Sequence, residues 1–387
     1  MANLTRADDT IERTAFTGSA QPEKSVTFGA ILPLTGGAAD QGEWARNGIK
    51  LAVDQLNHSR NSGPAAENPA PRPVIKVIFE DSRGESKAAI AAYNAMRARY
   101  DIPAIFTWGS GVGIALTPLV NRDKVIQIGI ATGSPDYSTL DDFTFRTFHS
   151  NLDEAAFADS VIDRLSGGKP VAILKIQNDY GIAYGDEVRR LLEKRGKNVV
   201  FDETFAPGET DFRQLLLKMK AVNPAAIVLI SYPAEGAVIL AQKKQLGITA
   251  PVLASVAVLS SRSFFKLTGS AAEGLRVIVP TNRVIQETAL MKDFVADYME
   301  QHGEDLGIIN WYAARAYDSV MVTASLLGRC PQADAACLRE QLYTIKDFPG
   351  VAGPITFDRA GDIATVFTLD RINGQKFEAD DEAAAEH

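Results

Sequence analysis

Short runs of β-branched and other apolar residues alternate with helix-like segments along most of this chain. Four strands are expected in its first part, at 26–32, 74–80, 104–108 and 125–131. Helices are expected between them, at 42–57, 85–99 and 113–121, because apolar residues recur there every three or four positions. Strands that alternate with crossover helices form a doubly wound parallel sheet, so an α/β fold is expected.

The same alternation starts again after residue 170. Five further strands are expected, at 171–176, 198–202, 226–231, 252–255 and 275–279. Helices are expected near 183–195, 211–222, 235–246, 289–302 and 311–327. The remaining C-terminal part is too short to form a third domain. We therefore predict two similar lobes, which the last part of the chain returns to complete.

Three connections are expected between the lobes, around His149, Pro280 and Asp362. Lobe 1 is predicted at 25–148 plus 280–362, and lobe 2 at 149–279 plus 363–378. Residues 1–24 are predicted to be disordered and 379–387 to form a polar tail. Because connections that run side by side make a hinge rather than a loose linker, we expect the lobes to open and close.

Composition and charge limit the classes of partner. The 387 residues include 40 basic and 48 acidic side chains, which gives a net charge of −8 at neutral pH. This sign disfavours nucleic acid, because neutralising phosphates requires a basic surface. No run of about 18 apolar residues occurs, so direct membrane insertion is not expected. Residues 1–24 lack the apolar stretch of a signal peptide, which fits a mature exported protein and a cytosolic protein equally.

The chain has two cysteines, Cys330 and Cys337, in the segment GRCPQADAAC. A disulfide between them would close a short loop and would indicate a periplasmic or other extracytoplasmic location. Two buried thiols in a cytosolic chain also fit the sequence. No further cysteine and no histidine cluster lies nearby, so no metal site is expected.

Distinct residue types follow the predicted strands at their carboxyl ends, where ligands bind in open parallel sheets. In lobe 1 these residues are mostly hydroxyl-bearing residues and glycines, including Ser110 and Thr132. In lobe 2 they include two tyrosines, Tyr180 and Tyr232. Lobes that face each other would hold a small ligand between them. Hydroxyls and helix-start N–H groups would bind its polar end, and aromatic rings would contact its body.

Ten short motifs occur in order along residues 25–375. They are VTFGAILPLTGGAADQGEWARNGIKLAVDQLN at 26–57, FEDSRGE at 79–85, TWGSGVG at 107–113, IATGSP at 130–135, FRT at 145–147, NDYG at 178–181, GETDF at 208–212, AAEG at 271–274, YAARAYDSV at 312–320 and GPITFDRAGD at 353–362. In this order they resemble the branched-chain amino-acid (leucine/isoleucine/valine) binding proteins of ABC importers. The resemblance implies a type I periplasmic binding protein, in which two lobes with three crossovers close on a ligand.

The resemblance also implies binding roles for lobe 1. Ser110 matches the position whose hydroxyl and amide bind the ligand carboxylate. Ala131 and Thr132 match contacts at the next strand end, and a one-residue gap would move this role to Gly133 or Ser134.

Further roles are implied at the sides and mouth of the cleft. Trp108 matches a position that lines the ligand's side chain. Tyr180 and Tyr232 match tyrosines that close over the ligand from lobe 2. Gln41 falls at the mouth, where the family often has an aromatic residue.

One departure from the family pattern concerns charge. Amino-acid binders of this family carry an acidic residue a few positions after the fourth strand of lobe 2, where it pairs with the ligand ammonium. The matching stretch here, SVAV at 255–258, has no carboxylate. A desolvated ammonium without an anionic partner costs several kcal/mol. Either Asp179 or Glu235 replaces the missing acid, or the ligand has no α-ammonium. Trp108, where the family has a smaller residue, favours an aromatic or other organic carboxylate, with amino acids as the alternative.

These observations predict an extracytoplasmic solute-binding protein, a monomer without a cofactor, that delivers a small carboxylate to the permease of an ABC importer. The same clamp serves as a ligand sensor in receptors and regulators, but no helix-turn-helix precedes it here and no membrane span follows it. An enzyme is not expected. A dinucleotide-binding loop would need glycine where Ile114 stands, and no G-x-S-x-G turn with a histidine partner occurs.

Overall fold

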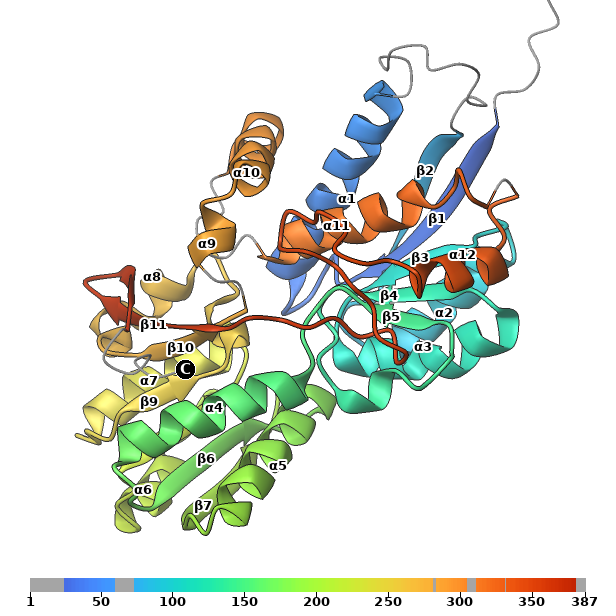
Figure 1. Cartoon of the computed structure of the whole chain (residues 1–387). Coiled ribbons are helices and arrows are strands. Elements are labelled where there is room, and N and C mark those ends of the chain that lie inside the picture. The colour runs from blue at the N-terminus through green and yellow to red at the C-terminus, as the bar shows by residue number, and fades with distance from the viewer. Residues whose placement is uncertain (1–23, 60–72, 281–282, 305–310, 331, 381–387) are drawn as a thin grey trace, which may run out of the picture.

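The computed structural model describes residues 24–59, 73–280, 283–304, 311–330 and 332–380. The predicted disordered segment, apart from Lys24, and residues 381–387 of the predicted tail lie outside the described residues. The described chain forms two α/β lobes, each built on its own sheet (Figure 1). The predicted fold class is confirmed.

The sheet of lobe 1 has parallel strands in the order β2-β1-β3-β4-β5. These strands are β1 (Ser25–Leu32), β2 (Val74–Asp81), β3 (Ala104–Thr107), β4 (Ile126–Gly129) and β5 (Thr144–Arg146). The helices between the first four are α1 (Ala39–Ser59), α2 (Ser86–Arg97) and α3 (Ser110–Asp123). Strand β5 was not predicted, because three residues are too few to give a periodic pattern.

The sheet of lobe 2 has the order β12-β11-β10-β9-β8-β6-β7. Its strands are β6 (Val171–Ile176), β7 (Val199–Phe205), β8 (Ala226–Ile230), β9 (Val252–Ala254), β10 (Arg276–Val279), β11 (Thr368–Asn373) and β12 (Lys376–Ala379). Its helices are α4 (Asn151–Ser166), α5 (Asp179–Lys194), α6 (Arg213–Ala221), α7 (Pro233–Gln245) and α8 (Phe264–Thr268). Helix α4 was not predicted.

The last hairpin differs from the predicted parallel arrangement, because β11 pairs antiparallel with both β10 and β12. Gly374 and Gln375 join β11 to β12, and both have positive φ angles, 54° and 65°. This backbone conformation is that of a type I′ turn, which joins antiparallel strands. The returning chain therefore adds an antiparallel edge to the parallel sheet. Its strand β12 includes Ala379, which the sequence placed in the polar tail.

The chain crosses between the lobes after β5, after β10 and before β11 (Figure 1). The three crossings touch one another or a common partner. The His149 ring of the first crossing packs edge-on against the Phe367 ring of the third, with centroids 5.2 Å apart. Arg315 accepts a hydrogen bond on its carbonyl from Thr147 Oγ1 at 3.2 Å and donates one to the Pro280 carbonyl at 3.5 Å. The crossings therefore form one connected hinge.

The part of the chain after the second crossing begins with α9 (Arg283–Gln286) and returns to lobe 1. Helices α10 (Ala289–His302) and α11 (Trp311–Ser325) pack against α1, and α12 (Ala335–Leu342) contacts β4. A Cβ on Gly48 of α1 would lie 2.1 Å from the Ala313 carbonyl oxygen, so only glycine allows α11 to approach this closely. A disulfide joins Cys330, in the connection after α11, to Cys337 in the first turn of α12. None of the described helices combines the length and apolar character needed to cross a membrane.

Candidate ligand-binding site

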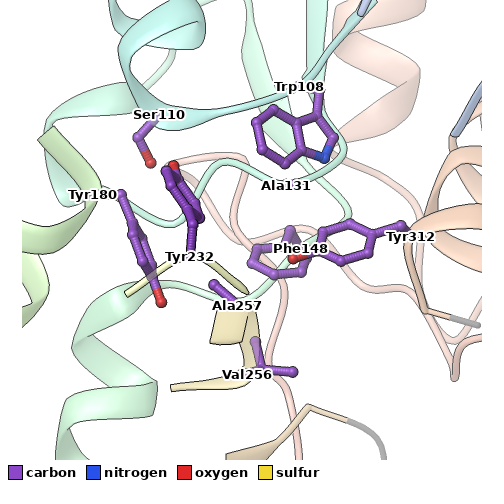
Figure 2. Close-up of a pocket in the computed structure, with 9 residues that line it drawn as sticks. All are labelled: Trp108, Ser110, Ala131, Phe148, Tyr180, Tyr232, Val256, Ala257 and Tyr312. Carbon is purple, nitrogen blue, oxygen red and sulfur yellow. The ribbon is translucent and has the colours of Figure 1, made fainter. Parts of the chain in front are cut away.

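Residues of both lobes meet in a pocket at the carboxyl ends of the strands (Figure 2). The residues that line it are Trp108, Ser110, Ala131, Phe148, Tyr180, Tyr232, Val256, Ala257 and Tyr312. Strands β3 and β4 of lobe 1 lead into the first three, and strands β6, β8 and β9 of lobe 2 lead into the tyrosines at 180 and 232 and the pair at 256–257. The pocket thus lies at the sheet edge where ligands bind in open parallel sheets.

Five of the eight residues predicted to bind ligand line this pocket together: Trp108, Ser110, Ala131, Tyr180 and Tyr232. Ser110 begins helix α3 of lobe 1, and Tyr180 lies in the first turn of α5 of lobe 2. Their side chains face the same space (Figure 2). The structure therefore brings together the hydroxyl of one lobe and the phenol rings of the other.

Thr132 and Gly133 do not line the pocket, although both follow β4. The Thr132 side chain is fully buried, and its hydroxyl is 3.5 Å from the Gly109 carbonyl oxygen. A Cβ on Gly133 would lie 2.0 Å from Asn151 Oδ1. Both residues are thus packed against neighbouring protein, and Ala131 is the residue of this strand end that reaches the pocket.

Gln41 also lies outside the pocket. It is buried in α1, and its Nε2 donates hydrogen bonds to the Ser260 carbonyl and, at 3.1 Å, to Ser260 Oγ. Ser260 belongs to lobe 2, directly after the short turn at Val256–Leu259. Gln41 therefore joins the two lobes rather than lining the cavity.

Four pocket residues were not predicted as binding residues. Phe148 lies in the first crossing and Tyr312 in the first turn of α11, and their rings stack with centroids 6.1 Å apart. Phe148 follows β5, a strand too short to be predicted, and Tyr312 follows no strand, so the strand-end rule applied to the predicted strands finds neither. Val256 and Ala257 belong to the stretch at 255–258, which lacks the acidic residue that the family pattern has there. This departure from the pattern was the signal that could have identified them as pocket residues.

The aromatic rings nearly fill the space between the lobes. Tyr180 stacks on Tyr232 with centroids 5.9 Å apart, and Trp108 lies 6.5 Å from Tyr232 and 6.2 Å from Tyr312. The free volume is about 20 Å³, room for about one water molecule. A ligand would therefore have to part these rings, which requires the lobes to open.

Several polar groups at the pocket are buried with unused hydrogen-bonding capacity. Within the described residues, Trp108 Nε1 has no hydrogen-bond partner, and the Tyr180 hydroxyl and Ser255 Oγ have no partner apart from each other. Ser110 Oγ accepts a hydrogen bond from the Ser134 N–H at 3.2 Å, and its own hydroxyl proton can still be donated. Since buried polar groups usually find partners, these groups are free to bind polar atoms of a ligand.

The tyrosines at the pocket stay uncharged at neutral pH. Burial and the nearby Glu154 carboxylate hold the pKa of Tyr180 well above its usual value. Burial likewise raises the pKa of Tyr232, and it raises the pKa of Tyr312 to about 12. Each hydroxyl is therefore a neutral group that can donate a hydrogen bond.

No carboxylate is present among the described residues that line the pocket. The Glu235 side chain instead accepts a hydrogen bond from the Gly208 N–H at 2.8 Å. Asp179 faces the start of α3, where a Cβ on Gly111 would lie 2.8 Å from its Oδ2. The acids that the sequence offered as replacements thus lie outside the cavity.

One further acid, Glu154, lies fully buried behind the pocket. Its Oε2 is 2.8 Å from His149 Nε2, and its carboxylate also interacts with the Tyr184 hydroxyl, while Oε1 makes no hydrogen bond of normal geometry within the described chain. Its charge acts on Tyr180 and Tyr312, but it does not line the cavity. The described residues also contain no group of acidic, histidine or cysteine side chains suited to a metal ion.

The comparison with known families gives the context for this geometry. The sequence profile described as "Periplasmic binding protein" matches residues 25–366, most of the chain. The chain belongs to the periplasmic binding protein family. This family consists of solute-binding proteins, and a periplasmic location is what membership implies.

The chain is similar to proteins from several bacteria. The "Leu/Ile/Val-binding protein homolog 3" of Brucella melitensis is 24% identical, over 88% of this chain and 89% of the relative. The branched-chain amino acid transporter substrate-binding protein LivJ of Streptococcus pneumoniae, solved with isoleucine, has a TM-score of 0.81 at 22% identity, covering 92% of this chain and 98% of that one. A solute-binding protein of an ABC transporter from Rhodopseudomonas palustris, solved with 3,4-dihydroxybenzoic acid, has a TM-score of 0.74 at 21% identity, covering 90% and 93%.

Proposed function

We propose that this protein is the extracytoplasmic solute-binding protein of an ABC importer. It captures a small carboxylate-bearing ligand between its lobes and delivers it to a membrane permease as a monomer. The observation that carries this proposal is the pocket itself, in which Ser110 of one lobe faces Tyr180 and Tyr232 of the other. A site divided between two hinged bodies is suited to capture and release rather than to catalysis.

The proposed ligand is a monocarboxylate without an α-ammonium group, with an aromatic or other apolar body. Ser110 and the N–H groups at the start of α3 are placed to bind the carboxylate. The rings of Trp108, Phe148, Tyr232 and Tyr312 are placed to pack on the body. An ammonium in this pocket would be desolvated without a carboxylate among the described lining residues, which costs several kcal/mol.

Closure is proposed to follow binding to lobe 1. The ligand would then meet Tyr180 and Tyr232, which contact it only in the closed state. Because these contacts are absent in the open state, they shift the equilibrium toward closure. The expelled water also strengthens each remaining polar contact, since the local dielectric falls.

A hydrophobic amino acid is the second candidate ligand, and Glu154 is the observation that favours it. This buried acid has one unpartnered oxygen close to Tyr180 and Tyr312. Its Oε2 is paired with His149, so Oε1 is the oxygen that an ammonium group would have to reach. The Brucella relative, a Leu/Ile/Val-binding protein homolog, and LivJ, solved with isoleucine, agree with this candidate.

A thermal-shift screen tests the proposal. The panel contains amino acids, aromatic monocarboxylates such as benzoate, aliphatic monocarboxylates, dicarboxylates and amides. A ligand at a hundredfold excess over its Kd adds about 2.7 kcal/mol to the free energy of unfolding, so a true ligand raises the unfolding temperature clearly. A hit must also compact the protein in small-angle X-ray scattering at high sodium chloride, where the ligand-free lobes are expected to be open. A panel with no stabilising carboxylate, or a hit that leaves the scattering unchanged, contradicts the proposal.

A further inference from the structure

The two lobes meet a second time outside the pocket, through the side chain of Arg262. Arg262 follows the turn at Val256–Leu259 in lobe 2. Its Nε and Nη2 donate to the two carboxylate oxygens of Glu304 at 2.5 and 2.7 Å. Its Nη1 donates to Asp40 at 2.8 Å and to Glu43 at 3.2 Å. One guanidinium thus binds three carboxylates, with the paired geometry on Glu304 that makes arginine contacts strong.

Neighbouring groups hold the same contact in place. The Arg262 N–H and the Ser261 hydroxyl each donate to Asp40 Oδ2 at 3.2 Å. The guanidinium lies over the Trp44 ring at 5.1 Å, and Trp44 Nε1 donates to Glu304 Oε1 at 3.2 Å. The Arg262 side chain is therefore fixed by ring stacking as well as by charge.

The three acidic partners belong to lobe 1. Asp40 and Glu43 lie in α1. Glu304 follows α10, which is tied to α1 by the hydrogen bond from Gln55 to Asp297 at 2.7 Å. Since Arg262 belongs to lobe 2, every one of these ion pairs crosses between the lobes. None of the four residues is among those that line the pocket.

We propose that Arg262 is a positioning residue for ligand binding, acting as a latch that holds the lobes closed. We call Arg262, Asp40, Glu43 and Glu304 the rim latch. Opening the cleft separates the arginine from its partners and leaves three carboxylates close together on lobe 1. The latch therefore raises the population of the closed, binding-competent state, and a larger competent population gives a tighter apparent Kd. This inference uses the clamp motion of the proposed function but not the identity of the ligand.

The charged side chains of the rim latch are partly exposed to solvent, whereas most of the residues that line the pocket are buried. The side chains of Arg262 and Asp40 are each 34% exposed, and that of Glu43 is 47% exposed. Charge interactions at such positions are screened, because the Debye length falls from about 10 Å at 0.1 M salt to about 3 Å at 1 M. We therefore expect salt to open the ligand-free protein.

The test measures the radius of gyration of the ligand-free full-length protein by small-angle X-ray scattering at low and high sodium chloride. The wild-type protein should be compact at low salt and expand at high salt. Arg262→Met should be expanded at both salt concentrations. The matched control is Arg195→Met, because Arg195 pairs with Asp159 and Asp163 inside lobe 2. This control should behave like the wild-type protein.

Two further variants separate a latch from a merely structural role. Arg262→Lys should restore part of the compaction, and Glu304→Gln should give a radius between those of wild type and Arg262→Met. For the ligand identified by the screen, Arg262→Met should weaken binding about tenfold while the unfolding temperature stays within the range of the Arg195→Met control. Equal radii for wild type and Arg262→Met at both salt concentrations would overturn the latch. That result would not contradict the proposed function. Conversely, if no carboxylate bound, the proposed function would fail, but the scattering test of the ligand-free protein would still decide whether the latch exists.

Discussion

The pocket and the rim latch join the same two lobes by opposite chemistry. The pocket brings five aromatic side chains into a cavity without a carboxylate among the described lining residues. The rim latch brings an arginine and three carboxylates together at a partly exposed edge. Opening of the lobes would break both sets of contacts, but dissolved salt screens only the charges of the rim latch.

This difference separates two properties of a clamp. The pocket determines which ligand is bound, because only its groups touch the ligand. The rim latch determines the population of the closed state. Its residues do not contact the ligand, so its effect on binding should be the same for every ligand. Substitutions in the two regions should therefore have distinguishable effects on ligand preference and on salt dependence.

The largest expected effect comes from adding an acid to the pocket wall. Val256→Glu places a carboxylate beside the proposed anionic ligand, and we expect the affinity for the monocarboxylate identified by the screen to fall at least about a hundredfold, or about 2.8 kcal/mol. Isothermal titration calorimetry measures the change. Val256→Gln has nearly the same shape without the charge and should lose less than about tenfold. Equal losses in the two variants would show that shape rather than charge sets the preference.

Ser110→Ala removes the hydroxyl proposed to bind the carboxylate. We expect binding to weaken at least about tenfold, which corresponds to about 1.4 kcal/mol. The control is Thr132→Val, because the Thr132 hydroxyl is buried outside the pocket. Titration calorimetry on both variants distinguishes them. An unchanged Kd for Ser110→Ala would remove Ser110 from the site.

A smaller effect is expected at Gln41, which follows Asp40 of the rim latch in α1 and donates across the cleft to Ser260. Gln41→Ala should weaken binding about fivefold for every ligand alike, because a net hydrogen bond contributes about 1 kcal/mol and this contact favours only closure. Gln55→Ala, which removes hydrogen bonds within lobe 1, serves as the control. A change in ligand preference in Gln41→Ala would place Gln41 in the pocket instead.

The smallest effect on binding is expected at Asp81, which lies in neither region. Burial acts to raise the pKa of Asp81, but hydrogen bonds from the Thr35 hydroxyl and from three backbone N–H groups outweigh it and lower the pKa. A carboxyl with a lowered folded-state pKa stabilises the fold above its unfolded-state pKa, and this stabilisation is lost as the pH falls through the folded-state pKa.

Asp81→Asn should accordingly lower the free energy of unfolding by about 1 kcal/mol at neutral pH, with wild type and variant converging in acid. Denaturant unfolding across this pH range measures the difference. Binding affinity and its salt dependence should stay unchanged. A gap between the two proteins that persists in acid would assign the effect to the lost shape of the turn rather than to the charge of Asp81.

The sequence predicted those parts of the site that follow from strand periodicity. Trp108, Ser110 and Tyr180 stand directly after apolar runs, so a parallel sheet must place them at one edge. Phe148 obeys the same rule, but it follows β5, which is too short to be predicted from periodicity. Tyr312 does not follow a strand, and it reaches the pocket because the start of α11 packs beside it.

Charge was the harder part to predict. The missing acid at 255–258 could be read from the sequence, but the position of Glu154 depends on how α4 packs behind the tyrosines. The rim latch depends on residues 40, 262 and 304, which are far apart in the chain and have no periodic signal. These residues come together only where the two lobes contact each other, and the sequence alone does not show that contact.

The most direct test of the pocket chemistry compares two ligands that differ only in the ammonium group. Titration calorimetry with L-leucine and 4-methylpentanoate, and in parallel with L-phenylalanine and 3-phenylpropanoate, keeps each carbon skeleton constant. We expect the acid without the ammonium to bind at least about a hundredfold more tightly in the pair whose skeleton fits, because an unpaired buried ammonium costs several kcal/mol. Tight binding of the amino acid with no binding of its deaminated partner would contradict this expectation.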